Sequence, residues 1–137
     1  MSSTNVDVVR DQFAAVNERD FGRAMDGYAE DVVLVVPPEL FLESGTFEGR
    51  EAVGRGFGDW FSTFGPGYRF DIEEARDVGD TGDLVLIVAS HTGRGRGSGV
   101  EVSGHTGYLY TVRDGKVARV EVYAGREEAL EAASREG

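Results

Sequence analysis

Residues 100–124 read VEVSGHTGYLYTVRDGKVARVEVYA, and two apolar runs flank the dipeptide Asp114-Gly115. Valine, tyrosine and threonine favour strands, and Asp-Gly between two such runs is a strong signal for a tight hairpin turn. The stretch therefore predicts two antiparallel strands, Val100 to Val112 and Lys116 to Ala124.

Further strands are predicted on the N-terminal side of this hairpin. Tyr68 to Val78 and Leu84 to about Gly93 are strand-like runs separated by glycine-containing turns. Val32 to Val36 is a short β-branched run that ends at Pro37-Pro38, because proline offers no amide to a sheet. Together these runs predict an antiparallel sheet.

Helices are predicted around the first strand and at the end of the chain. Apolar residues at three- and four-residue intervals indicate amphipathic helices, and Asp20 is a candidate N-cap. The predicted helices cover Thr4 to about Arg19, Asp20 to Ala29, Gly49 to about Phe64, and a last segment with Ala129, Leu130 and Ala133 on its apolar side. Helices followed by a strand meander predict an α+β fold, and the length predicts one domain over residues 1–137.

Composition narrows the classes of function. The chain has no cysteine and only two histidines, so we expect no disulfide, no metal site and no cofactor. The formal net charge of −11 argues against nucleic acid and anionic membrane surfaces as partners. No apolar run approaches the roughly 20 residues that span a bilayer, so we expect a cytoplasmic protein.

The run Leu84 to Ala89 is apolar on both faces of its predicted strand. One face would lie under the helices. The other needs cover as well, which a second copy of the chain would supply, so the sequence predicts a homodimer through the outer sheet face.

Four motifs carry a resemblance to a known family: Tyr28-Ala29-Glu30-Asp31, Phe47-Glu48-Gly49-Arg50-Glu51-Ala52, Arg113-Asp114-Gly115-Lys116-Val117 and Glu121-Val122-Tyr123. In this order the chain resembles the SnoaL-like branch of the nuclear transport factor 2-like superfamily over nearly its whole length. The resemblance implies a cone-shaped curved sheet wrapped by N-terminal helices, a cystatin-like roll, with an apolar pocket open at one end. That superfamily contains isomerases, dehydratases, cyclases, epoxide hydrolases and non-catalytic binding modules.

The resemblance also allows particular active sites to be tested. Gln12, Val36 and Tyr108 align with the oxyanion donor, the carboxylate base and the protonated aspartate of a ketosteroid-isomerase-like site. Val36 cannot abstract a proton, which disfavours that chemistry, although Gln12 and Tyr108 remain hydrogen-bond donors for a ligand carbonyl. The surroundings of His91 lack the Arg-x-Asp of an epoxide-hydrolase-like site, so that chemistry is disfavoured too.

The two histidines are the most suggestive feature. A hairpin centred on Ser98 sets His91 opposite His105 and Asp83 opposite Arg113, so the imidazoles would share a proton, a water or a substrate oxygen. SnoaL-like dehydratases use histidines as general acid and base in this way. However, the alternation that puts Val88, Tyr108 and Tyr110 on the pocket face puts both histidines on the opposite face unless a β-bulge intervenes, which favours structural or interface histidines.

The face of Arg119, Glu121 and Tyr123 depends on the turn. A two-residue turn at Asp114-Gly115 places them with Tyr108 and Tyr110, and a three-residue turn moves them to the other face. In the first case Glu121 would be a candidate base. Alternating charges on a last strand are more often a solvated or dimer-contact stripe.

We place the pocket between the third helix and the strand that carries Tyr108. The predicted catalytic residues are His91, His105 and Tyr108, and the predicted ligand-binding residues are Gln12, Phe13, Tyr28, Val36, Phe41, Phe57, Trp60, Tyr110 and Glu121. The expected partner is a small apolar or aromatic molecule. Three functions stay open: a cofactor-free isomerase, dehydratase or cyclase; a non-catalytic pocket protein; and a bare dimerisation module.

Overall fold

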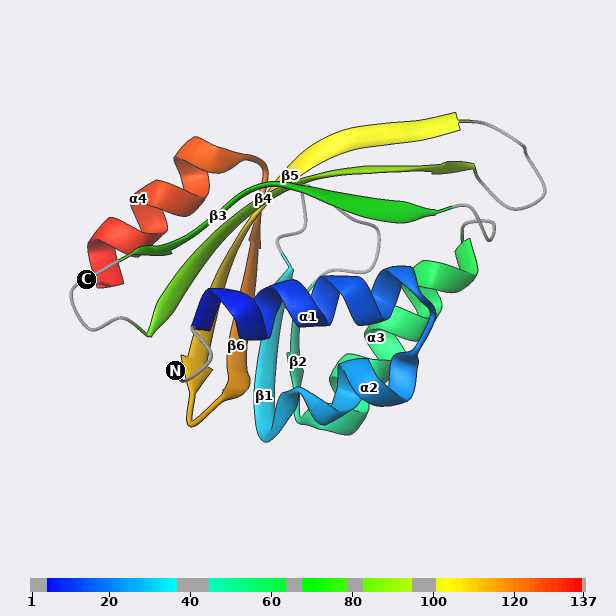
Figure 1. Ribbon diagram of the computed structural model, residues 1–137, viewed down its shortest axis with the longest axis horizontal. Coiled ribbons are helices and arrows are strands. Elements are labelled where there is room, and N and C mark those ends of the chain that lie inside the picture. Colours follow the sequence, from blue (N-terminus) through cyan, green and yellow to red (C-terminus); the bar gives the residue numbers. More distant parts are fainter. Residues whose placement is uncertain (1–4, 37–44, 64–67, 79–82, 95–100, 137) are drawn as a thin grey trace.

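The computed structural model describes residues 5–36, 45–63, 68–78, 83–94 and 101–136. Its elements are α1 (Asn5–Asn17), α2 (Phe21–Asp26), β1 (Tyr28–Val36), β2 (Gly45–Glu48), α3 (Arg50–Thr63), β3 (Arg69–Val78), β4 (Leu84–Arg94), β5 (Glu101–Arg113), β6 (Lys116–Tyr123) and α4 (Arg126–Glu136). They form the predicted α+β fold, in which helices pack on a curved sheet (Figure 1). None of the described helices is long and apolar enough to cross a membrane.

The described strands form one sheet in the order β2-β1-β6-β5-β4-β3. The neighbouring pairs are antiparallel, as predicted, with one exception: β1 runs parallel to β6. β2, which pairs with Val33 to Val36, was not predicted from the sequence. Its sequence Gly-Thr-Phe-Glu contains one large apolar residue and therefore shows no apolar alternation.

The junction between α2 and β1 differs from the prediction. The Asp20 side chain accepts a hydrogen bond from Arg23 N at 3.2 Å, which confirms it as the N-cap. α2 ends at Asp26, and the carbonyl of Gly27 already accepts a bond from Val117 N at 2.8 Å. Tyr28 therefore opens the first strand and is not part of the helix.

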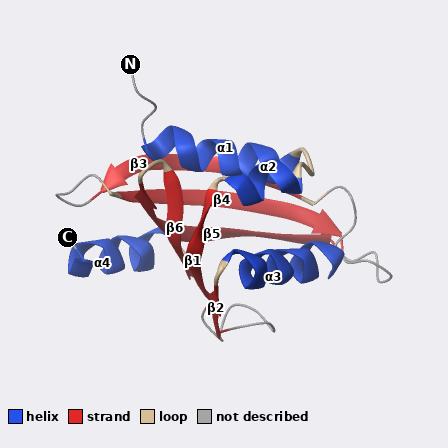
Figure 2. Ribbon diagram, turned by 90° about the horizontal axis from the view of Figure 1, so that it is seen from below, coloured by secondary structure: helices blue, strands red, loops and turns tan. Residues whose placement is uncertain are grey.

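The sheet has two faces of different character. The inner face lies under α1 and carries Val85, Ile87, Tyr108 and Tyr110, whereas the outer face carries Leu84, Leu86 and Leu109. α3 also lies on the inner face, since Val53 belongs to the same core cluster as Val9 and Phe13 of α1. Figure 2 shows α3 and α4 on opposite sides of the central strands β1 and β6.

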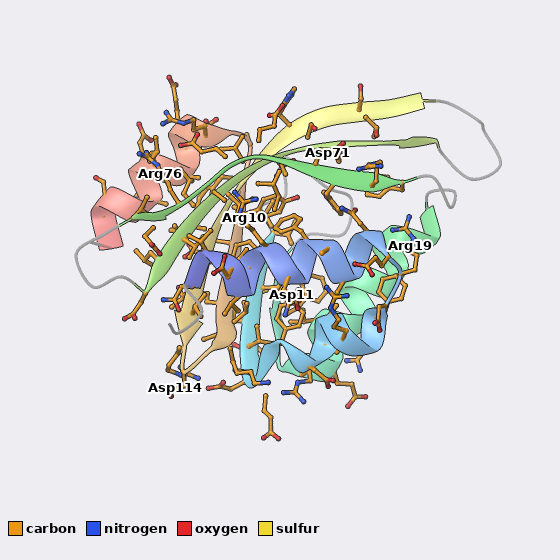
Figure 3. The ribbon with its side chains drawn as sticks, viewed as in Figure 1. Arg10, Asp11, Arg19, Asp71, Arg76 and Asp114 are labelled. Atoms are coloured by element: carbon orange, nitrogen blue, oxygen red, sulfur yellow. The ribbon has the colours of Figure 1, made fainter. Side chains whose placement is uncertain are left out.

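A bulge in β6 determines on which face each of its residues lies. The turn is the predicted two-residue one, with positive φ at Asp114 (53°) and Gly115 (76°), and Asp114 marks its tip in Figure 3. Val112 pairs with Val117, but Thr111 pairs with Arg119, so Ala118 is an extra residue. From Arg119 onward the side chains therefore point to the opposite face from that expected for a regular ladder.

α4 covers part of the outer face within the single chain. Leu109 is fully buried and Leu84 is 7% exposed, and both pack against Ala132 and Ala133 of α4. The cover that the homodimer prediction required is thus partly supplied by the chain's own last helix. The homodimer stays a prediction, with a weaker basis.

Candidate functional site

A small, partly open cavity lies between α1 and the inner face. Its volume is about 40 Å³, and its described lining residues are Gln12, Phe13, Val16, Tyr28, Leu34, Phe70, Tyr108, Tyr110, Val120 and Val122. A cavity of about 150 Å³ is known to admit benzene. The space under α1 is therefore too small for a whole aromatic ring unless side chains move.

α1 is held over the cavity by its C-terminal residues. The Asn17 side chain donates a hydrogen bond to Phe70 O at 2.7 Å and accepts one from Phe70 N at 2.9 Å. It thus satisfies the Phe70 backbone in the way that a neighbouring strand does. Arg19, which has a positive φ of 61°, donates to the carbonyl of Tyr68. These contacts anchor the helix to β3 and so position Gln12 and Phe13 above the sheet.

The polar groups of the lining are neutral. Burial raises the pKa of Tyr28, Tyr108 and Tyr110 above the ordinary tyrosine value. For Tyr108, proximity to Tyr68 acts in the same direction, and a hydrogen bond with Thr106 acts against it. No carboxylate stands among the described lining residues. The cavity is therefore suited to an uncharged apolar molecule with a hydrogen-bonding group.

Gln12 and Arg50 each have a buried side-chain atom without a hydrogen-bond partner among the described residues, and that of Gln12 lies beside the cavity. Gln12 is 4% exposed, and its atom without a partner is the carboxamide oxygen. An unsatisfied buried acceptor costs about 1–3 kcal/mol. Its nitrogen lies against Gly27, where a Cβ would stand 1.6 Å from it.

The predicted histidine pair is absent. Ser90, not His91, lies opposite His105, because the hairpin register differs by one residue from the predicted one. His91 is therefore on the inner face and His105 on the outer face, where its Nε2 lies 3.3 Å from a Glu73 oxygen. The two imidazoles cannot share a proton, and Arg113 pairs with Asp31 at 3.0 Å instead of Asp83.

His91 lies beside the cavity in an aromatic cluster. Its Nδ1 is hydrogen bonded to the hydroxyl of Tyr68 at 3.1 Å, and its ring centroid lies 6.3 Å from that of Phe70, which lines the cavity. The ring lies over Gly104, where a Cβ would stand 3.1 Å from Nε2. Burial lowers the pKa of His91, and the charge of His105 acts in the same direction, so the imidazole is neutral at pH 7.

The candidate base Glu121 lies on the outer face, and so do Arg119 and Tyr123. The Tyr123 hydroxyl donates to one Glu121 oxygen at 2.6 Å, and Arg119 Nε donates to the other at 3.2 Å. The turn has two residues, as in the alternative that placed Glu121 with Tyr108. That prediction was wrong because the extra residue Ala118 reverses the faces.

The structure brings together five of the predicted site residues: Gln12, Phe13, Tyr28, Tyr108 and Tyr110 line the cavity. Val36 is buried in the main core and is not part of the described lining. Val88, predicted on the pocket face, lies on the outer face because it pairs with Gly107 in the shifted register. Phe41 lies outside the described residues, as do the side chains of Phe57 and Trp60 on α3.

Five lining residues were missed: Val16, Leu34, Phe70, Val120 and Val122. The alternation of Val32, Leu34 and Val36 was a signal for Leu34, whereas the bulge concealed the face of Val120 and Val122. Among the described residues, no group of three or more histidine, aspartate or glutamate side chains is placed to hold a metal ion.

Comparison with known proteins identifies similar sequences and folds. Residues 9–120 match the sequence model of the SnoaL-like domain, and no curated protein matches the chain. A candidate polyketide cyclase from Sinorhizobium meliloti is 26% identical, with a TM-score of 0.66 over 85% of this chain and 93% of that one.

Two other solved structures share the fold at lower identity. TerC, co-crystallised with polyporic acid, is 21% identical, with a TM-score of 0.76 over 97% of this chain and 99% of that one. A protein with a ketosteroid isomerase-like fold from Catenulispora acidiphila, in complex with trimethylamine, is 18% identical, with a TM-score of 0.72 over 93% and 92%.

Proposed function

The chain belongs to the family of SnoaL-like domains, and on that premise we propose that it binds a small, largely apolar molecule in the cavity under α1. The observation that carries the proposal is the lining: apolar walls, neutral tyrosines and a buried amide, with no carboxylate among the described residues. Such a wall favours an uncharged ligand because a buried charge without a partner is costly.

Native mass spectrometry of the purified protein tests this proposal. We expect a co-purified small molecule on the wild type. Leu34 lines the cavity, whereas the adjacent Val33 lies on the other face of β1, so Leu34→Phe fills the cavity and Val33→Phe serves as its matched control. The molecule should be lost from Leu34→Phe only. If both variants retain it, the ligand lies elsewhere and the proposal is wrong.

Acid–base catalysis is a second candidate, and one observation favours it. His91 is neutral, half-buried and hydrogen bonded to Tyr68, and it contacts Phe70 at the edge of the cavity. A neutral imidazole accepts a proton at physiological pH. The likeness to a candidate polyketide cyclase is consistent with such chemistry.

Deuterium exchange into the co-purified molecule tests catalysis. A base that removes a proton from the ligand exchanges it with D₂O and returns a deuteron. Mass spectrometry measures the deuterium that the ligand gains. Wild type and His105→Gln should incorporate deuterium, whereas His91→Gln should not. Equal incorporation by both histidine variants would assign the proton transfer to another group.

A further inference from the structure

Gln12 is placed in a way that folding alone does not explain. Its carboxamide is almost fully buried in an otherwise apolar part of the molecule, and its oxygen has no partner among the described residues. A methionine of similar length would avoid the cost of an unsatisfied acceptor at this position. Unsatisfied buried groups of this kind are rare in proteins, and one explanation for them is function.

The surroundings of Gln12 provide room for this amide. Gly27 leaves the space that the carboxamide nitrogen occupies, since any Cβ there would overlap with it. Gln12 itself lines the cavity together with Tyr108 and Tyr110. Two positions, Gln12 and Gly27, thus combine to bury one polar amide beside the cavity.

The chemistry of these groups indicates the ligand class. The Gln12 oxygen only accepts hydrogen bonds, whereas the neutral phenols of Tyr108 and Tyr110 both donate and accept. We propose that the Gln12 oxygen accepts a hydrogen bond from a ligand hydroxyl, so that the cavity selects hydroxylated apolar molecules, of which phenols are the simplest. This inference rests on the proposed binding function. The volume of about 40 Å³ suits the hydroxyl end, with the ring toward the open part of the cavity.

Three monosubstituted benzenes of similar size separate the effect of a hydrogen-bond donor from that of an acceptor. Phenol donates and accepts, anisole only accepts, and toluene does neither, so NMR titrations of the protein with each probe isolate the effect of the donor. For the wild type we expect phenol to bind about tenfold more tightly than anisole or toluene, the factor typical of one hydrogen bond. In Gln12→Met this preference should disappear, with toluene affinity retained.

The melting temperature of the ligand-free variant provides a second readout. Because the wild-type amide is unsatisfied, Gln12→Met should melt at or above the wild-type temperature. A melting temperature well below that of the wild type would show that the amide is structural and would overturn the inference, as would a preference for phenol that survives in Gln12→Met.

The experiment also distinguishes this inference from the function on which it rests. If phenol, anisole and toluene bind the wild type equally and Leu34→Phe abolishes all three, cavity binding stands and the role of Gln12 is wrong. If none of the three probes binds the wild type, the proposed binding function fails, and the inference fails with it.

Discussion

The two faces of β5 and β6 are built from adjacent residues and have opposite properties. On the inner face, Tyr108 and Tyr110 surround an apolar cavity with neutral hydroxyls. On the outer face, Glu121 is held by Tyr123 and Arg119, whose side chain is 43% exposed. The carboxylate of Glu121 therefore lies away from the cavity, and a base chosen from this strand by residue type alone would be placed on the wrong side of the sheet.

A carboxylate introduced on each face should give the largest difference in stability between the two faces. Val120 is 1% exposed on the inner face, so Val120→Glu buries a carboxylate without a partner and should lower the free energy of unfolding by about 4 kcal/mol or more. Thr111 lies on the outer face opposite Arg119. Thr111→Glu should therefore change the free energy of unfolding by about 0.5 kcal/mol or less. Urea denaturation of both variants measures the contrast, and equal losses would refute it.

A methyl group at Gly27 should have the next largest effect. Gly27→Ala places a Cβ against the Gln12 amide and should destabilise the fold by about 3 kcal/mol. Removing the amide with Gln12→Ala should relieve the clash, so the double variant should lose less than the sum of the single losses.

Gly58→Ala is the control for this substitution. Gly58 lies in α3 with no atom within 4 Å of a Cβ built there, so alanine should stabilise the helix by about 0.5–1 kcal/mol. Additive losses in the Gln12→Ala and Gly27→Ala double variant would show that the two residues are independent.

Loss of a tyrosine hydroxyl should lower stability more on the outer face than on the inner face. Tyr123→Phe removes a 2.6 Å hydrogen bond to a carboxylate and should cost about 1.5 kcal/mol. Tyr110→Phe removes a hydroxyl at the cavity and should cost about 0.5 kcal/mol or less without ligand. Thermal denaturation compares the two, and a larger loss for Tyr110→Phe would reveal a structural role for its hydroxyl.

The smallest effect concerns the pH dependence of stability. The pKa of His91 lies below its usual 6.5 in the folded state, so the unfolded chain binds more protons below that pH. Stability from this residue is therefore complete above pH 6.5 and is lost as the pH falls toward the lowered pKa. His91→Gln should remove this part of the decline between pH 7 and 5, which denaturation at several pH values measures, and an unchanged decline would refute the prediction.

Local patterns made much of the fold predictable. Asp114-Gly115 between alternating runs correctly indicated a two-residue turn, and Asp20 correctly indicated a helix start. These features depend on backbone conformation and hydrogen bonds within a few residues, which the local sequence specifies. Gln12 and Tyr108 were expected at the pocket from the family resemblance, and they line the cavity together with Phe13, Tyr28 and Tyr110.

Long-range pairing was less predictable. A shift of one residue in the β4–β5 register separated His91 from His105, and the extra Ala118 moved Glu121 to the outer face. Side chains alternate with a period of two, so an error of one residue reverses every face, and no local pattern distinguishes the two outcomes when both faces are apolar.

The sequence alone determined the order and type of most elements, the absence of thiol chemistry and the family resemblance, because composition, hydrophobic period and turn residues act over short distances. Only the tertiary structure decided which residues share a cavity, which carboxylate is remote from it, and that the Gln12 side-chain oxygen is buried with no partner in the described part of the chain. Those properties depend on register and on helix placement over the sheet, which are set by packing between segments far apart in the chain.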